Sequence, residues 1–177
     1  MTPEIRRATA RDAGALAELA ARTFAETYAA FNDPADMAAH LAARYSEVKQ
    51  AQEIADPAAC YIVAEWGGRL IGYAYLAADR APSEIRLDGP VELVRFYVAR
   101  EWHGRGVAQL LMAASVVEAR RRGGRTLWLG VWQQNPRAIA FYRKAGFGIV
   151  GTTAFRLGSQ VQDDHVMALE LAAVAAP

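Results

Sequence analysis

Two glycines, Gly104 and Gly106, occupy the short link between a strand-like segment and an amphipathic helix. Residues 91–98 are rich in Val, Leu, Phe and Tyr, which favour a strand, and apolar residues then recur at helical spacing. The first N–H groups of a helix have no partner within it, and the helix dipole adds partial positive charge there. Glycines let a phosphate approach that backbone closely. The spacing therefore predicts a phosphate-binding site at residues 103–108.

The ligand class follows from what this link lacks and from what it resembles. A dinucleotide fingerprint needs a third glycine where the chain has Gln109, and the Gly-Lys-Ser/Thr ending of a nucleotide P-loop is missing. The run HGRGVA resembles the acyl-CoA signature of the GCN5-related N-acetyltransferases, the GNAT family. That signature opens with Gln or Arg, so a His there changes one side-chain contact and leaves the backbone site intact. The resemblance assigns the cofactor to His103, Gly104, Arg105, Gly106, Val107 and Ala108.

A second segment, NPRAIAFYRKAGF at residues 135–147, resembles the other signature of this family, in which Asn opens a helix and Phe-Tyr precedes a Lys/Arg-x-Gly-Phe end. The matching positions are Asn135, Ala138, Phe141, Tyr142, Lys144, Gly146 and Phe147. The two signatures cover about residues 91–150. The resemblance implies an α/β (α+β sandwich) GNAT fold: a mixed central sheet of about seven strands with helices on both faces, its fourth and fifth strands parallel and splayed.

The reaction implied by the resemblance is direct attack of an amine on acetyl-CoA. An alkyl amine, with a pKa of about 10.4, must lose a proton, the carbonyl oxygen must be stabilised as charge develops, and the thiolate must leave. The resemblance implies that Tyr142 protonates the thiolate. It also implies that Glu92 is the base, acting directly or through water.

The strand before the glycines is implied to bind the cofactor too. In the family this strand splays from its neighbour and the pantetheine arm pairs in the gap like an extra strand. The backbone of Phe96, Tyr97 and Val98 would then face the cofactor and supply the oxyanion donors. Asn135 is implied as a second pantetheine contact, and it is also suited to cap a helix.

Structural roles compete with both catalytic assignments. Tyr142 forms with Ala138 and Phe141 the i, i+3, i+4 spacing of a core stripe. Glu92 lies in an apolar strand, where a salt bridge with an arginine would also account for it. A chain of ordered waters is an alternative base.

Alternation along the strand gives Glu92 a definite direction. With a period of two, its side chain lies on the same side as those of Val94, Phe96 and Val98. We therefore expect the carboxylate and these apolar groups to line one surface.

Cationic residues offer several anion contacts. The arginines at 120–122 lie at least 14 residues beyond the glycines, roughly 20 Å along a helix, too far to reach a pyrophosphate. At a helix C-terminus they are expected to have a structural or solvating role. Arg105 is the better phosphate contact, and Arg143 and Lys144 are candidates for the 3′-phosphate.

The amine acceptor is expected between the loop joining the first two helices, residues 79–90 and the turn at 156–163. Tyr28 and Phe31 can form an apolar wall there or simply pack. Acidic residues that suit a cationic amine are Glu26, Asp33, Asp36, Asp163 and Asp164. The stretch TFAETYAAFNDPADMAAHL also resembles the bacterial branch of the family that acetylates polyamines and similar small amines.

The elements that must position these residues follow in the order β-αα-β-β-β-α-β-α-β-β. Strands are expected at 5–8, 61–66, 69–77, 91–98, 126–131, 147–155 and 162–171, and helices at about 12–28, 35–45, 46–54, 107–122 and 135–144. The Gly67-Gly68 pair predicts a tight hairpin, and Gly123-Gly124 ends the long helix.

Length and composition limit the number of domains, the location of the protein and its classes of partner. The 177 residues contain no repeat or linker, so one domain spanning 1–177 is expected. A net charge of +1, no signal peptide and no long apolar run favour a cytoplasmic monomer or homodimer that binds neither nucleic acid nor membrane. Cys60, the one cysteine, is expected to be a buried free thiol, and His40, His103 and His165 are too dispersed for a metal site.

Together these patterns favour an acetyl-CoA-dependent N-acetyltransferase that modifies a small primary amine such as a polyamine. A protein N-terminal or lysine acetyltransferase of the same fold is one alternative. A non-catalytic acyl-CoA-binding regulator is another, and Tyr142 and Glu92 argue against it.

Overall fold

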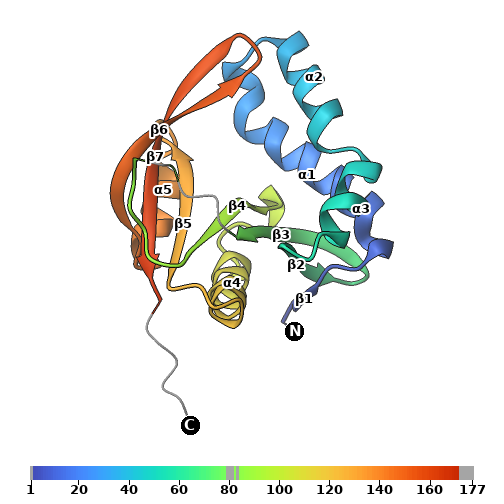
Figure 1. The fold of residues 1–177 in the computed structure, drawn as a ribbon. Coiled ribbons are helices and arrows are strands. Elements are labelled where there is room, and N and C mark those ends of the chain that lie inside the picture. The colour runs from blue at the N-terminus through green and yellow to red at the C-terminus, as the bar shows by residue number, and fades with distance from the viewer. Residues whose placement is uncertain (1, 79–81, 83, 172–177) are drawn as a thin grey trace.

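The computed structural model describes residues 2–78, 82 and 84–171, which form one mixed sheet with helices on both faces (Figure 1). Its strands are β1 (Glu4–Arg7), β2 (Ala59–Trp66), β3 (Arg69–Ala78), β4 (Pro90–Val98), β5 (Thr126–Trp132), β6 (Gly148–Leu157) and β7 (Gln160–Glu170). They lie in the order β1-β2-β3-β4-β5-β7-β6, and each neighbouring pair is antiparallel except β4 with β5. The fold expected from the sequence is confirmed.

The described helices divide between the two faces of the sheet. They are α1 (Ala13–Tyr28), α2 (Pro34–Arg44), α3 (Glu47–Ala55), α4 (Val107–Arg121) and α5 (Pro136–Lys144). On one face, Leu16 and Phe24 of α1 pack with Tyr61 of β2. On the other, Leu111 of α4 packs in the same core as Leu127 of β5. Two apolar cores therefore sandwich the sheet.

Helix starts follow the local sequence. Asp33 accepts a hydrogen bond from the Ala35 N–H at 2.8 Å, and Pro34 occupies the first position of α2. Asn135 accepts from the Ala138 N–H at 3.1 Å ahead of α5. Each side chain satisfies a donor that the helix itself leaves open, and the cap predicted at Asn135 is confirmed.

β4 and β5 pair only at their beginnings. The parallel register is Pro90 with Thr126, Val91 with Leu127 and Glu92 with Trp128. β4 continues to Val98 and β5 to Trp132 without further pairing between them. This confirms the expected splay, and the gap beyond Glu92 and Trp128 is called the wedge below.

A β-bulge interrupts β4 at Val94. Leu93 lies opposite Leu76 of β3 and Arg95 lies opposite Tyr75, so one residue of β4 has no counterpart. A bulge of this kind bends the strand and changes the phase of its side chains.

The bulge overturns the predicted alternation of side chains. Val94 and Tyr97 pack on the α1 side of the sheet, whereas Phe96 and Val98 pack on the α4 side. Glu92 lines a cavity together with Val94 and Tyr97. The prediction that Glu92 shares a side with Phe96 and Val98 was wrong, because the extra residue shifts the period-two pattern by one.

Arg95 holds the bulge against α3. Its guanidinium donates to Glu53 at 2.7 and 3.1 Å, and it lies 5.1 Å from the ring centroids of both Tyr45 and Tyr75. The Tyr61 hydroxyl donates to the same Glu53 carboxylate at 2.6 Å. The buried arginine is thus fully paired and helps to fix the shape of β4.

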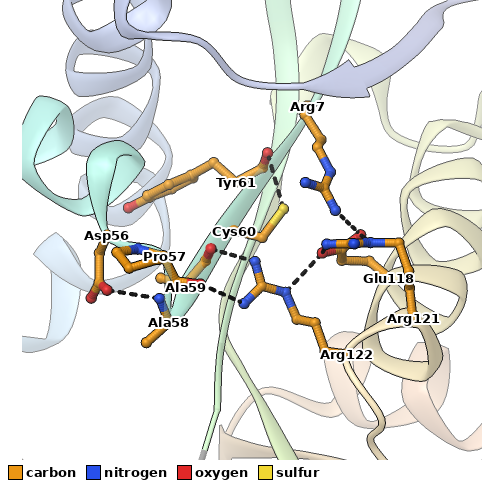
Figure 2. Close-up of polar contacts among 10 residues, drawn as sticks. All are labelled: Arg7, Asp56, Pro57, Ala58, Ala59, Cys60, Tyr61, Glu118, Arg121 and Arg122. Carbon is orange, nitrogen blue, oxygen red and sulfur yellow. Dashed lines mark hydrogen bonds and ion pairs between the residues drawn. The ribbon is translucent and has the colours of Figure 1, made fainter.

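The C-terminal end of α4 is tied to the other edge of the sheet (Figure 2). The buried Glu118 carboxylate accepts from Arg7 of β1 at 2.5 Å and from Arg121 and Arg122 at 3.0 and 2.7 Å. Arg122 also donates to the Ala59 C=O at 2.5 Å. Arg121 and Arg122 therefore have the structural role expected of this arginine run.

The β6–β7 hairpin is long and its tip reaches α2 (Figure 1). At the tip, both the N–H and the hydroxyl of Ser159 donate to Asp36, at 2.8 and 2.7 Å. The hairpin and α2 together close one side of the molecule over β4 and β5.

Three further findings concern the described residues. Cys60 is a buried free thiol, as expected. No group of three or more His, Cys, Asp or Glu side chains in this part of the chain gathers as a metal site. None of its helices has the length and apolar character needed to cross a membrane.

Candidate active site

The link between β4 and α4 forms an open backbone site, called the cradle (residues 103–108). Gly104 and Gly106 have φ of +74° and +82°, a conformation that other residues adopt at a cost. A Cβ atom at either position would meet no atom within 4 Å. Gly106 precedes α4, and no side chain caps its N-terminus. The first N–H groups of α4 are thus available to a ligand, which fits the predicted phosphate site.

A cavity of about 230 Å³ joins the cradle to α5. Its lining combines glycine backbone from the cradle with side chains from β4 and α5. The lining residues are Phe96, Val98, Trp102, His103, Gly104, Gly106, Val107, Ala108, Gln109, Arg137, Ala138, Phe141 and Tyr142. The two sequence signatures therefore meet at one site.

His103 links the cradle to both walls of this cavity. Its Nε2 lies 2.8 Å from the Val98 C=O, and its Nδ1 lies 2.7 Å from Nη1 of Arg137. Because a guanidinium can only donate, Nδ1 must accept, and Nε2 must carry the hydrogen that goes to Val98. His103 is thus a spacer between strand and helix, and it orients the Arg137 cation beside the cradle.

Arg137 is a site residue that the sequence reasoning missed. It lies two positions after Asn135 at the start of α5 and lines the cavity beside the cradle. Arg105, nominated for phosphate, instead lies with its guanidinium 5.4 Å from the Trp102 ring centroid. Arg143 and Lys144 are exposed and line none of the cavities described here.

The backbone of β4 directs alternate peptide groups into the wedge. The Ala99 N–H donates to the Ile71 C=O of β3 at 2.8 Å. Since hydrogen-bonded and non-hydrogen-bonded pairs alternate in an antiparallel ladder, Tyr97 bonds to β3 while Phe96 and Val98 do not. The N–H groups of Phe96 and Val98 therefore face away from β3, toward β5.

A cavity of about 440 Å³, the wedge cavity, lies where β4 and β5 diverge. It brings together residues from α1 and the turn after it, from β4, from the cradle and from α5 and its cap, which the sequence nominated separately. Among its lining residues are Tyr28, Phe31, Phe96, Tyr97, Val98, His103, Asn135 and Tyr142. Glu26 also lines it.

Tyr142 reaches this cavity from within the core. Its side chain is 8% exposed and packs edge-on against Phe96 and Phe147, with ring centroids 6.2 and 5.7 Å apart. Burial raises the pKa of the Tyr142 phenol well above its ordinary value. The group thus keeps its proton at neutral pH and can act as a donor, while its ring also serves the core.

A larger cavity, about 680 Å³, lies under the β6–β7 hairpin and is called the hairpin cavity. It shares Tyr28, Val94, Arg95, Tyr97 and Gly130 with the wedge cavity, so the two adjoin. Aromatic rings, carboxylates and cations line the rest: Phe24, His40, Arg44, Tyr45, Pro82, Glu84, Glu92, Trp128, Thr153, Ala154, Phe155, Arg156, Gln162 and Asp164.

The acidic residues considered as partners of the amine lie in different environments in the structure. Glu92 and Asp164 line the hairpin cavity, and burial raises the pKa of Asp164 to about 6, with the Asp163 carboxylate adding to the shift. Asp33 caps α2 and Asp36 binds Ser159, so both have structural partners. Within the predicted loop at 79–90, residues 79–81 and 83 lie outside the described part of the chain.

Comparisons with known proteins agree with this geometry. A family model described as "Acetyltransferase (GNAT) family" matches residues 17–147. An uncharacterized N-acetyltransferase of Mycobacterium tuberculosis is 38% identical over 160 residues, which cover 90% of this chain and 98% of the relative.

Solved structures share the whole fold. A PaiA N-acetyltransferase from Thermoplasma acidophilum, in complex with coenzyme A, superposes with a TM-score of 0.78 at 24% identity, covering 96% of this chain and 99% of that one. A putative acetyltransferase from Salmonella typhimurium, with its cofactor acetyl-CoA, has a TM-score of 0.68 at 26% identity and covers 100% and 98% of the two chains.

Proposed function

The chain belongs to the acetyltransferase (GNAT) family and is an acetyl-CoA-dependent N-acetyltransferase, and we propose that its acceptor is the primary amine of a small molecule. The observation that carries this proposal is the hairpin cavity. Its volume of about 680 Å³ suits a small ligand, and it places the carboxylates Glu92 and Asp164 among aromatic rings beside the wedge. The carboxylates can bind the ammonium of a polyamine or another short aliphatic amine and the aromatic rings can pack against it, while Arg44, Arg95 and Arg156 balance the charge of the rest of the lining.

The cradle is proposed to hold the pyrophosphate of coenzyme A. The empty space at Gly104 and Gly106 leaves the backbone open to an anion, and the uncapped start of α4 supplies N–H donors from Val107 and Ala108. Arg137, oriented by His103, adds positive charge. Arg105, whose guanidinium lies 5.4 Å from the Trp102 ring centroid, is proposed as a further contact of this anion.

Residues of the wedge are proposed to serve the acetyl transfer. The N–H groups of Phe96 and Val98 face the gap and are suited to stabilise the carbonyl oxygen as it gains charge. Tyr142, kept protonated by burial, is suited to give a proton to the departing thiolate. Asn135 caps α5 and lines the same cavity, so its amide is free to offer an N–H donor to the pantetheine arm. Glu92, nominated from the sequence as a base acting directly or through water, lines the adjoining hairpin cavity.

Thiol release measured with acetyl-CoA over a panel of amines tests the proposed acceptor. The panel contains butane-1,4-diamine, spermidine, 2-aminoethanol, an aminoglycoside, glycine amide, and peptides with a free N-terminus or a lysine. We expect turnover with at least one small amine, together with an acetylated product of the corresponding mass. Turnover confined to the peptides, or coenzyme A binding without any thiol release, would contradict the proposal.

A further inference from the structure

The hairpin cavity collects polar atoms that lack partners. Trp128 is 5% exposed, yet its indole N–H has no hydrogen-bond partner among the described residues. The same holds for Oε1 of Gln162 and Oδ1 of Asp164, and all three residues line this cavity. Buried polar groups are costly without partners, so such a concentration in one cavity indicates that a polar ligand completes it.

The Gln162 side chain is oriented by a chain of hydrogen bonds. Nδ2 of Asn32 donates to the Tyr28 C=O at 2.8 Å, which leaves Oδ1 of Asn32 to accept from Nε2 of Gln162 at 3.3 Å. A backbone carbonyl can only accept, so the direction of both amides is determined. Oε1 of Gln162 therefore presents an acceptor to the cavity.

Asp164 presents a second acceptor from the same strand. It lies two residues after Gln162 on β7, so the two side chains project from the same face. Its Oδ2 lies 3.4 Å from where a Cβ of Gly130 would stand, so the glycine of β5 leaves room for the carboxylate. Two acceptor oxygens side by side call for a group with several N–H donors, which describes an ammonium.

The sheet register places Asp164 nearer to the wedge than Glu92. Glu92 is level with Trp128, where β4 and β5 still pair, whereas Asp164 lies opposite Trp132, four residues further along β5. Four residues of strand span roughly 13 Å. The Phe96 N–H is a similar distance beyond Glu92. The Asp164 carboxylate, whose Oδ2 lies beside Gly130, is therefore further along the wedge than Glu92, which lies where the wedge begins.

We propose that Gln162 and Asp164 bind the ammonium group of the acceptor and that Asp164 takes the proton which must leave before attack. This inference rests on the proposed function, an amine acetyltransferase. The ammonium loses its first proton to the Asp164 carboxylate, which returns it to solvent after turnover. The nitrogen lone pair then forms the C–N bond while the C–S bond breaks and its electron pair leaves on sulfur. The nitrogen gives its second proton to Tyr142, which restores the phenol after Tyr142 has protonated the thiolate.

Other groups set the charge around Asp164. Tyr28 faces it from α1, Asp163 is its neighbour on β7, and Glu92 and Arg95 face the cavity from β4. Further charged or titratable groups lining the cavity are His40, Arg44, Tyr45, Glu84, Tyr97 and Arg156. Burial raises the pKa of Asp164 to about 6, which leaves it ionised at neutral pH and a stronger base than an ordinary Asp.

The decisive variant is Asp164→Asn, which keeps the shape and removes the charge. With the amine that turns over fastest in the panel, we expect kcat/KM for the amine to fall about 100-fold. The affinity for coenzyme A, measured by calorimetry, should stay within threefold. Glu170→Gln is the matched control, because that exposed side chain lies on the same strand and lines neither cavity. It should keep the rate within threefold.

The pH profile separates a proton acceptor from a merely structural residue. The wild-type enzyme should show kcat/KM rising to about pH 6 and then level up to the pKa of the amine. Asp164→Asn should instead rise tenfold per pH unit from 6 to 9, since it depends on amine already neutral in solution. If the variant keeps the wild-type profile, Asp164 is not the proton acceptor and the inference is overturned.

Gln162→Met tests the binding half of the proposal without removing a charge. It retains the length of the side chain but removes the acceptor oxygen, so we expect KM for the amine to rise about tenfold with a smaller change in kcat. An unchanged KM in both variants would overturn the assignment while leaving amine acetylation intact. A wild-type enzyme that acetylates no amine in the panel would instead contradict the proposed function itself.

Discussion

The polar groups at the two ends of α4 differ in whether they have hydrogen-bond partners within the chain. At the C-terminal end, the Glu118 carboxylate accepts hydrogen bonds from three arginines (Figure 2). The backbone N–H groups of residues 122–124 donate to the C=O groups of Glu118, Ala119 and Arg120. At the N-terminal end, no side chain caps the helix. The glycines differ in the same sense. A Cβ at Gly124 would come within 2.8 Å of the Ala119 C=O, whereas one at Gly106 would meet nothing within 4 Å.

This contrast distinguishes polar groups that stabilise the fold from polar groups that bind a ligand. Polar groups that hold the fold have their partners within the chain, as Glu118 and Arg95 do. Polar groups that await a substrate lack them, as the start of α4 and Asp164 do. The distinction predicts that variants of the first kind lose stability and keep activity, and that variants of the second kind do the reverse.

The largest effect, on the affinity for coenzyme A, is expected from Gly106→Trp at the N-terminal end of α4. The indole would fill the empty space of the cradle, so we expect the affinity for coenzyme A to fall more than 100-fold by calorimetry. Gly68→Trp in the β2–β3 turn is the matched control, because Gly68 has a similar φ of +75° and equally empty surroundings. Both variants bear the same backbone strain, and only the first blocks a ligand. Affinity retained in Gly106→Trp would place the cofactor elsewhere.

The C-terminal end of α4, where the polar groups are paired, is tested by Glu118→Gln. The change keeps the shape but leaves Arg7, Arg121 and Arg122 facing a neutral group, and removing one partner of a buried ion pair is strongly destabilising. Because Arg7 and Arg121 are more than half exposed, solvent reduces the cost, and we expect a loss of about 2–4 kcal/mol in urea unfolding. Glu18→Gln, at an exposed site on α1, should cost little. A drop in kcat at 25 °C for Glu118→Gln would weaken the comparison.

The sequence predicted the open end of α4 better than any other part of the site. Gly104, Gly106 and the signature at Asn135 carry local backbone requirements, and such requirements are visible in a short run of residues. The splay of β4 from β5 followed from the resemblance to a family rather than from composition. The cap at Asn135 could be predicted for the same local reason.

Long-range features escaped sequence reasoning. The bulge at Val94 is accompanied by a contact of Arg95 with Glu53, which lies 42 residues earlier in the chain, and no spacing reveals that contact. The bond between His103 and Arg137 joins two elements that only the fold brings together. Asp164 was one of several acidic candidates, and only the register of β7 with β5 places it further along the wedge than Glu92.

A smaller effect on turnover is expected from Tyr142→Phe. Phenylalanine preserves the packing against Phe96 and Phe147 but removes the proton that the thiolate would take. We expect kcat to fall about 10–100-fold with unchanged affinity for coenzyme A. Phe141→Leu disturbs the same aromatic cluster without removing a donor. If it lowers kcat as much as Tyr142→Phe does, packing rather than proton transfer explains the loss.

The smallest effect is expected in how the free energy of unfolding changes with pH, and there the direction of the change distinguishes Glu118 from Asp164. Burial alone would raise the pKa of Glu118, but hydrogen bonds from Arg121, Arg7 and Arg122 outweigh it and hold that pKa at about 2. Its stabilisation is therefore complete above its unfolded pKa near 4.5 and is lost as the pH falls toward 2. Asp164, with its pKa raised from 3.8 to about 6, behaves oppositely and destabilises the fold as the pH rises through 6.

Asp164→Asn should accordingly make the protein more stable while making it a poorer catalyst. At pH 4 the wild-type carboxyl is protonated and resembles the amide, so the two proteins should unfold at the same urea concentration. At pH 7 the ionised carboxylate lacks a partner, and the variant should be more stable by about 1 kcal/mol, a value reduced because the group is partly exposed. Glu118→Gln should differ from wild type least at pH 2 and most above pH 5. An Asp164→Asn variant less stable than wild type at pH 7 would mean that Asp164 belongs, like Glu118, to the scaffold.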